Sequence, residues 1–510
     1  MAVLIGSYST TLLGVSIFVA FLTYLTYKLL SDYLHKWFEM KPIPELGTTY
    51  PFIGNALQFK NNAGDFFRQI QDFTWEFRDK PLFKLWVGPV PFVVLYHAET
   101  VEPVLANSIH MEKAFAYKFL HPWLGTGLLT STGTKWRQRR KMLTPTFHFS
   151  ILEDFLEVMN EQAEILVEKL ENHAGKGPFN CFSLITLCAL DIICETAMGK
   201  KIYAQSNSDS EYVRSVYRMS DIVSRRQRSP WLWPDFIYTY FSEGRDHDKT
   251  LKVLHSFTYK VIHERAENMS CNESDSENDQ GKRKRRAFLD MLLSTTYEDG
   301  SKMSHEDIQE EVDTFMFRGH DTTAAAMNWA LHLLGSHPEV HKKVQQELQE
   351  VFGTSSRPTS TEDLKKLKYL ECVIKEALRL FPSVPFFARS LGEDCYISEL
   401  KIRSLAPETN VIGFACFWCH TFFVLLDGFK PEEFRPAYAY VPFSAGLRNC
   451  IGQRFALMEE KVVLAAILRN FTVEACQKRE DLRPVGELIL RPEKGIVIKL
   501  EKKTPQTSSN

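Results

Sequence analysis

The sequence feature that most constrains the fold is a cysteine between two glycines, in the stretch "VPFSAGLRNCIG" at residues 441–452. An apolar helical pattern follows directly, so we expect Cys450 at a helix N-terminus, where the dipole and free N–H groups favour a thiolate. Gly446 and Gly452 allow a tight loop to approach a large flat group, and Arg448 can meet an anion. A thiolate on such a loop suits the axial position of a metal. The alternative is a buried cysteine that acts only as a small apolar side chain.

The N-terminus carries a second constraint, because residues 1–27 contain no charged side chain and are long enough to span a bilayer. Lysines follow the apolar run, so the positive-inside rule predicts a lumenal N-terminus and a cytosolic remainder. We expect a single-pass anchor at 1–30 and a stiff, proline-rich connector at 31–54. A cleaved signal peptide is the alternative, but the run has no basic start and no clear small-residue cleavage site.

The rest of the chain predicts one mainly helical domain at 55–502 and a disordered tail at 503–510. The acidic and then basic run at 271–286 contains almost nothing apolar and indicates a disordered surface loop. The clearest periodic segments are the helical "YHAETVEPVLA" and "SILEDFLEVMNEQAEILVEKLENH" and the strand-like "PFVVLY" and "GIVIKL".

The charge and the cysteine content narrow the class of function. A formal net charge of −2 argues against a nucleic-acid-binding protein, because binding to phosphates needs a basic excess. Ten cysteines scattered over 510 residues do not form a disulfide scaffold, and they are expected to be reduced, as in a domain that faces the cytosol. The chain also lacks a glycine-rich nucleotide-binding motif, so electrons for redox chemistry would have to come from another protein.

The longest predicted helix runs from about 304 to 334, with Ser304 at the start of a capping box. Its centre, "GHDTT", does not resemble an ordinary helix interior. Gly319 lowers the helix propensity there, and Asp321 and Thr322 can compete for backbone hydrogen bonds. A long helix with a polar centre indicates a functional site at that centre. The alternative is a helix whose polar face lies in solvent.

Taken together, these motifs resemble those of the cytochrome P450 haem-thiolate monooxygenases, and within them the family 4 fatty-acid hydroxylases, especially the V subfamily. The cysteine loop matches the family's F-x-x-G-x-R-x-C-x-G pattern in full. "EALR" matches its E-x-x-R, "GHDTT" its oxygen-activation helix, "WRQRR" its W-x-x-x-R and "VPFFAR" its arginine-bearing strand. The resemblance covers nearly the whole chain. It implies a mainly α fold, with a large helical domain, a small β-rich portion and an N-terminal transmembrane helix.

The resemblance also implies a cofactor and a set of site residues. The cofactor is haem b, whose iron takes Cys450 as its axial thiolate ligand. Asp321 and Thr322 are expected to hold water and relay protons to bound dioxygen. The arginines of the expected cofactor-binding set would bind the haem propionates. That set consists of Trp136, Arg140, Arg389, Phe443 and Arg448.

By the same resemblance, the reaction is oxygen insertion into fatty-acid C–H bonds, at the terminal (ω) carbon. The expected electron donors are NADPH-cytochrome P450 reductase and, as a second candidate, cytochrome b5, at the endoplasmic reticulum membrane. The segment 231–241 resembles the family's membrane-dipping segment, with a buried helix junction as the alternative. The substrate pocket is expected to involve 113–129, "VPFF" and "GELILRP". Basic residues expected to meet the reductase are Arg137, Arg139, Lys141 and Arg454.

Two departures from the family pattern bear on this reading. Arg318 stands where family 4 commonly has a glutamate that forms an ester to a haem methyl. We therefore expect haem that is not covalently linked, and a carboxylate partner for Arg318 in the protein or on a substrate, because an unpaired charge in an apolar pocket is costly. Between 411 and 438 the family's meander pattern is disrupted, and Tyr438 replaces an arginine. The alternative is therefore a haem-poor or inactive relative, or a gene-model variant with a damaged meander.

The disrupted segment also contains "CFWCH" at 416–420, which fits the attachment signature of c-type haem. That signature would indicate an electron-transfer protein instead of an oxygenase. Its strongly apolar flanks and its place in the one anomalous segment argue against it. A zinc site is not favoured either, because no second Cys/His pair has suitable spacing.

Overall fold

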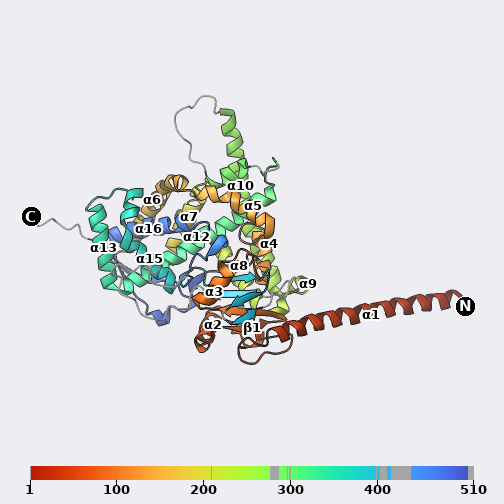
Figure 1. The fold of residues 1–510 in the computed structure, drawn as a ribbon. Coiled ribbons are helices and arrows are strands. Elements are labelled where there is room, and N and C mark those ends of the chain that lie inside the picture. The colour runs from red at the N-terminus through yellow and green to blue at the C-terminus, as the bar shows by residue number, and fades with distance from the viewer. Residues whose placement is uncertain are drawn as a thin grey trace, which may run out of the picture.

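The computed structural model describes residues 2–207, 210–275, 287–295, 297, 300–397, 399–402, 410–414 and 438–503. Within these ranges the protein is mainly helical, as expected, and α1 projects from the globule as a long rod (Figure 1). The α-helices are α1 (Ala2–Glu39), α2 (Ala63–Glu76), α3 (Ala98–Leu105), α4 (His121–Leu124), α5 (Gly133–Leu143), α6 (Phe149–Glu171), α7 (Phe182–Thr196), α8 (Glu211–Arg228), α9 (Asp235–Tyr238), α10 (Ser242–Asp275), α11 (Phe288–Ser294), α12 (His305–Ser336), α13 (Pro338–Phe352), α14 (Thr361–Lys366), α15 (Lys368–Leu380) and α16 (Gln453–Asn470).

The described strands form four small sheets. One has the order β1-β2-β7-β4, in which only the β2–β7 pair is parallel. A second has the order β3-β11-β8, and β9 with β10 and β5 with β6 form two-stranded pairs. The strands are β1 (Leu82–Val87), β2 (Val90–Leu95), β3 (Phe179–Asn180), β4 (Phe386–Ser390), β5 (Cys395–Ile397), β6 (Leu400–Ile402), β7 (Asn410–Phe414), β8 (Phe471–Ala475), β9 (Pro484–Gly486), β10 (Leu490–Pro492) and β11 (Val497–Lys502). The strand predictions for "PFVVLY" and "GIVIKL" are confirmed in β2 and β11.

Helix α1 has the properties expected of a membrane anchor. Its segment Leu12–Glu39 is, among the described residues, the one helix long and apolar enough to cross a bilayer, with a mean hydropathy of 1.7 over its most apolar 18 residues. At its base Tyr33 stacks on Phe52 with ring centroids 4.5 Å apart and also contacts Trp86 of β1. Lys84 donates a hydrogen bond to the Met40 carbonyl at 2.8 Å. The end of the anchor is therefore packed against the first sheet.

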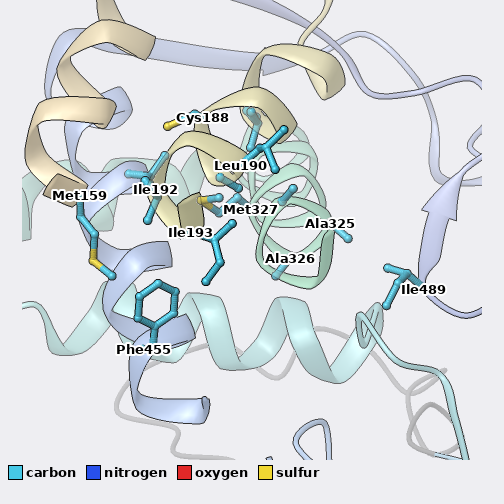
Figure 2. Packing of buried hydrophobic residues seen from close by; sticks show 14 of the residues in the cluster. Met159, Cys188, Leu190, Ile192, Ile193, Ala325, Ala326, Met327, Phe455 and Ile489 are labelled. Carbon is cyan, nitrogen blue, oxygen red and sulfur yellow. The ribbon is translucent and has the colours of Figure 1, made fainter. Parts of the chain in front are cut away.

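The core is organised around α12, which packs against α7, α15 and α16. Ser304 caps its start by accepting a hydrogen bond from the Asp307 N–H at 3.1 Å, as predicted. Gly319 lies where α7 approaches closely, because a Cβ there would be 2.5 Å from Ile193 Cγ1. Figure 2 shows Ile193 together with Met327 of α12 and Phe455 of α16 in this packed region. The central glycine thus permits close helix packing.

The structure revises one surface prediction and excludes the alternative to another. Helix α10 continues to Asp275, so the first part of the expected loop at 271–286 is helical, and 276–286 lies outside the described residues. The aromatic segment 231–241 forms a short 3₁₀ turn and α9, with the side chains of Phe236 and Tyr240 73% and 83% exposed. A buried helix junction is therefore wrong for these side chains. The expected tail is described only at residue 503.

Candidate functional site

A cavity lies between α12, α5 and the cysteine loop. It contains about 1360 Å³ of space free of protein atoms, part of it open to solvent. Cys450 and Phe443 of the loop, Trp136 and Arg140 of α5 and Thr322 of α12 all line it. The structure therefore brings together most of the residues singled out in the sequence. The polar centre of α12 forms a cavity wall and does not face solvent.

The loop that presents Cys450 is held by backbone contacts. The Cys450 N–H donates to the Phe443 carbonyl at 2.9 Å, and the Asn449 N–H donates to the Gly446 carbonyl at 3.2 Å. Gly446 has a φ of +70°, and a Cβ on it would lie 1.9 Å from the Leu105 carbonyl oxygen. This position therefore requires glycine, both for its backbone conformation and for its close approach to α3.

The charge state of Cys450 depends on its neighbours more than on the helix behind it. The side chain is open to the cavity but is surrounded by protein, and burial raises the pKa of its thiol. The guanidinium groups of Arg318 and Arg140 and the N–H of Gly452 act in the opposite direction and lower that pKa. The expectation that the helix N-terminus would by itself favour the thiolate is therefore incomplete. Bonding to a metal is what would hold this thiol deprotonated.

Arg140 is fixed to the cysteine loop itself. Its guanidinium donates to the backbone oxygen and to the side-chain oxygen of Asn449, each at 2.8 Å. Asn449 also lines the cavity and was not singled out in the sequence, because the loop pattern leaves its position free. The pair places a cation directly beside Cys450.

Arg448 acts both as a cavity cation and as a brace for the loop. It donates to the carbonyls of Met111 at 2.7 Å and Ser131 at 2.5 Å. Its guanidinium carbon lies 4.9 Å from the ring centroid of Trp136, a cation–π contact. Burial, together with the nearby Arg389, lowers the pKa of Arg448 to about 9. A buried cation held in this way favours an anionic ligand in the cavity.

Lys113 is a cavity residue that sequence reasoning missed as a cation. It lies beside Arg389, with which it forms a backbone bridge, and its ammonium group is 4.6 Å from the ring centroid of Tyr117. Burial is the main cause that lowers the pKa of Lys113 well below its ordinary value, and the charges of Arg389, Arg448 and Arg318 lower it further. Arg389 itself is buried on β4, and it is not among the described residues that line the cavity. Arg389 adjoins the cavity through its backbone bridge to Lys113, which does line the cavity.

The two expected proton-relay residues, Asp321 and Thr322, lie on different faces of α12. Thr322 lines the cavity, and its hydroxyl donates to the Arg318 carbonyl at 2.6 Å. Asp321 is not among the described lining residues. It is buried in an ion pair with Arg491 of β10, whose Nε donates to its Oδ1 at 3.1 Å. Arg491 lies 170 residues away, and no local sequence signal pointed to it.

The E-x-x-R pair is a buried feature of α15. Arg379 donates to both carboxylate oxygens of Glu376 at 2.6 Å, and both residues are about 3% exposed. The motif was weak as a sequence signal, since most such pairs are surface pairs, but the structure excludes that reading. Tyr438, which replaces the family arginine, has a φ of +64° and packs against the second core cluster. The "CFWCH" and "PEEFRP" stretches lie outside the described residues.

Two other expectations are wrong. Arg139 was expected to face a partner, but it is 1% exposed and is paired with Glu311 at 2.8 Å and with Asp307. Arg137, Lys141 and Arg454 are exposed, as expected. "GELILRP" does not contribute to the described cavity lining, since Ile489 and its neighbours are packed in the core. The other two segments expected in the substrate pocket do line the cavity: 113–129 through residues such as Tyr117 and Leu128, and "VPFF" through Val384 and Phe387.

Arg318 lines the cavity one helical turn before Thr322. No carboxylate among the described residues lies within 4.0 Å of its guanidinium, so the expected partner within the protein is not found in that part of the chain. Its guanidinium carbon lies 5.9 Å from the Phe317 ring centroid.

The residues fit a haem: a loop thiol faces a large cavity, and Arg140, Arg318 and Arg448 line the same cavity with Glu460 as the one carboxyl among its described lining residues. The family model described as "Cytochrome P450" matches residues 44–500. The chain belongs to the cytochrome P450 family. This P450 is 59% identical over 484 residues to human Cytochrome P450 4V2, with 93% of this chain and 92% of that protein covered.

Two further relatives agree with this placement. Rat Cytochrome P450 4V2 is 60% identical over 487 residues, with 93% of each chain covered. Drosophila melanogaster Cytochrome P450 4c3 is 45% identical over 487 residues, with 92% of this chain and 90% of that protein covered. The similarity confirms the resemblance to family 4 and to its V subfamily. This P450 is therefore a haem- and iron-dependent monooxygenase, an oxidoreductase, with an N-terminal helix of the kind that anchors proteins in membranes.

Proposed function

We propose that this P450 inserts one oxygen atom of dioxygen into a C–H bond of a fatty acid, at the terminal (ω) carbon. The observation that carries the proposal is the position of Cys450, whose thiol faces a cavity bordered by Thr322 and by apolar side chains. When bound, the haem supplies the iron that binds and activates dioxygen. Cys450 is its protein ligand, and thiolate ligation donates electron density that favours O–O cleavage.

The cations of the cavity have a holding role in this proposal. Arg140, Arg448 and Lys113 line the cavity and Arg389 adjoins it, so they would bind the two haem propionates by charge-assisted hydrogen bonds. Phe443 and Trp136 supply apolar contacts on the same side. We infer that the haem is held without a covalent link to α12, because an arginine at position 318 cannot form an ester.

The proton chemistry is assigned to α12. Thr322 Oγ1 faces the cavity and can hold a water or pass a proton on its inner side, once its hydroxyl turns from the Arg318 carbonyl. Asp321 lies on the adjacent face in a buried ion pair with Arg491, and it would exchange a proton only when that pair opens. In this arrangement Thr322 contacts the reacting atoms, and Asp321 supports it from behind.

A long acyl chain is the substrate class that the cavity suits. Leu128, Phe315, Val384 and Phe387 line it, and burial of methylene groups against such side chains is favourable by about 0.8 kcal/mol per CH₂. The cations of the cavity are assigned to the haem carboxylates, so the apolar lining is what supports the substrate class. That lining fits a long acyl chain better than a short or polar molecule.

The electron donor is proposed to be NADPH-cytochrome P450 reductase, with cytochrome b5 as a second donor, at the endoplasmic reticulum membrane. Arg137, Lys141 and Arg454 are exposed and would face the acidic surface of a donor. Helix α1 would place the catalytic domain on the cytosolic side, and exposed aromatics such as Phe236 would dip into the membrane surface.

One observation favours the alternative of a haem-poor relative. Tyr438 holds a left-handed backbone conformation, φ +64°, at the end of the disrupted segment, where the family has an arginine. Such a conformation is costly for a tyrosine. A version of the chain with a P-E-R-F-containing meander restored tests this alternative. Higher haem content in the restored version would support it, and equal haem content and turnover would remove the reason for it.

The decisive experiment for the proposed function is reconstitution of the purified full-length protein with the reductase, NADPH and a panel of fatty acids. Mass spectrometry of the products should identify ω-hydroxy acids. The same assay without reductase, and with Thr322→Val, should give little product. Haem-loaded protein that accepts electrons but leaves every fatty acid unchanged would contradict the substrate assignment.

A further inference from the structure

Arg318 is a cation without a described protein partner, and it faces the cofactor cavity. It lies on α12, one turn before Thr322, and it lines the cavity. No described carboxylate lies within ion-pairing distance of it, and the aromatic ring of Phe317 is 5.9 Å away. A guanidinium offers five N–H donors and no acceptor, so a half-buried one that lines a cavity favours an anion or water beside it.

The residues that share the cavity with Arg318 indicate where its anionic partner would bind. Arg318 lines the same cavity as Cys450, Lys113 and Arg448. Arg389 adjoins that cavity through its backbone bridge to Lys113. A flat group that faces the thiol and reaches those cations would therefore share the cavity with Arg318.

The charge balance of the cavity points the same way. Arg140, Arg318 and Arg448 are the arginines of its described lining, and Glu460 is the one carboxyl there. Burial raises the pKa of Glu460 well above its ordinary value, so it does not offset them. The deficit of negative charge must be met by whatever binds, and a haem brings two carboxylates with it.

We propose that Arg318 binds a carboxylate of the haem itself, as a non-covalent tether from α12 to the cofactor. The proposal rests on the haem site described above. A planar guanidinium suits two-point contact with a carboxylate. A fatty-acid carboxylate is the other source of the same chemistry, but at Arg318 it would place the acid end of the substrate next to Thr322. That orientation conflicts with oxidation at the terminal carbon.

The test measures haem loss from the full-length holoprotein to excess apomyoglobin. Arg318→Gln should release haem about tenfold faster, since it loses a charge-assisted contact, while Arg318→Lys should fall between. Arg68→Gln, a change at an exposed arginine of α2, is the matched control and should leave the rate unchanged. In protein loaded with haem dimethyl ester, whose carboxylates are masked, the wild type and Arg318→Gln should release the cofactor at equal rates.

Several results would overturn the inference. Equal rates of haem loss in wild type and Arg318→Gln would show that Arg318 holds no haem carboxylate. An undiminished difference with the dimethyl ester would assign the effect to something other than a haem carboxylate. Weaker spectral binding of dodecanoic acid, but not of dodecanol, in Arg318→Gln with unchanged haem loss would assign Arg318 to the substrate. A chain that takes up no haem would overturn the haem site as well, which separates the two failures.

Discussion

Replacement of Arg491 by methionine should destabilise this P450 strongly, although Arg491 does not line the cavity. Its Nε donates to Asp321 Oδ1 at 3.1 Å, and its second nitrogen pairs with Oδ2. Its guanidinium also lies 4.3 Å from the ring centroid of Tyr217. Asp321 is 1% exposed, so water cannot replace the arginine without opening the core. Methionine keeps much of the volume and removes only the charge and the donors.

The size of the effect follows from burial. Breaking a buried ion pair by removing one partner costs about 3–5 kcal/mol, because it leaves an uncompensated charge. The unfolding entropy of a domain is about 2.1 cal/mol/K per residue, so the matched region at 44–500 has a total of roughly 1 kcal/mol/K. The unfolding midpoint of Arg491→Met should therefore fall by about 3–5 °C.

The assay is thermal unfolding of the holoprotein, followed by far-UV circular dichroism at one fixed heating rate. The double variant Asp321→Asn/Arg491→Met removes both charges of this pair and should recover part of the lost midpoint, because Glu487, 3.4 Å from Arg491, still loses its partner. Arg491→Lys should lie between, because it keeps the charge and loses the two-point geometry. An unchanged midpoint in Arg491→Met, or equal losses in the single and double variants, would refute the reasoning.

Two further predictions concern the cysteine loop and the pH dependence. Gly446→Ala should abolish haem incorporation, because its Cβ would lie 1.9 Å from the Leu105 carbonyl; Gly133→Ala, at a φ of +55° in open space, should retain it, and equal haem content would contradict this. Burial lowers the pKa of His332 to about 4, so the unfolded chain binds a proton at this histidine more readily than the folded protein does. The free energy of unfolding should therefore fall by about 2 kcal/mol as the pH falls from 6.5 to 5. His332→Gln should show a smaller drop in unfolding midpoint between those pH values; the same drop would contradict it.

Local sequence signals predicted the local structure well. The N-cap at Ser304 and the start of α12 follow from side-chain chemistry within one turn. Gly446 was expected to let a tight loop approach a large flat group, and the structure shows that its missing side chain makes room for the Leu105 carbonyl of α3. The cysteine loop was predictable because its pattern is specific, and the structure places its thiol at the cavity.

What the sequence did not show are contacts between residues far apart in the chain. Asp321 read as a cavity residue because it adjoins Thr322, but a helix turns neighbouring side chains by about 100°, and the ion pair with Arg491 lies on the other face. Arg139 was expected at the surface with the other basic residues of its segment, but it is buried in an ion pair with Glu311, 172 residues away in the sequence. Lys113 lies in an apolar segment, and only the fold brings it next to Arg389.

The most direct test of the central claim is the spectrum of the reduced carbonyl complex in the wild type and in Cys450→Ser. Cys450 faces the cavity from its loop, and we propose it as the only protein ligand to the haem iron. The wild type should show the strongly red-shifted Soret band of thiolate ligation. Cys450→Ser should lose that band, and Cys416→Ala should keep it. A retained thiolate-type band in Cys450→Ser, or its absence from haem-loaded wild type, would contradict the account.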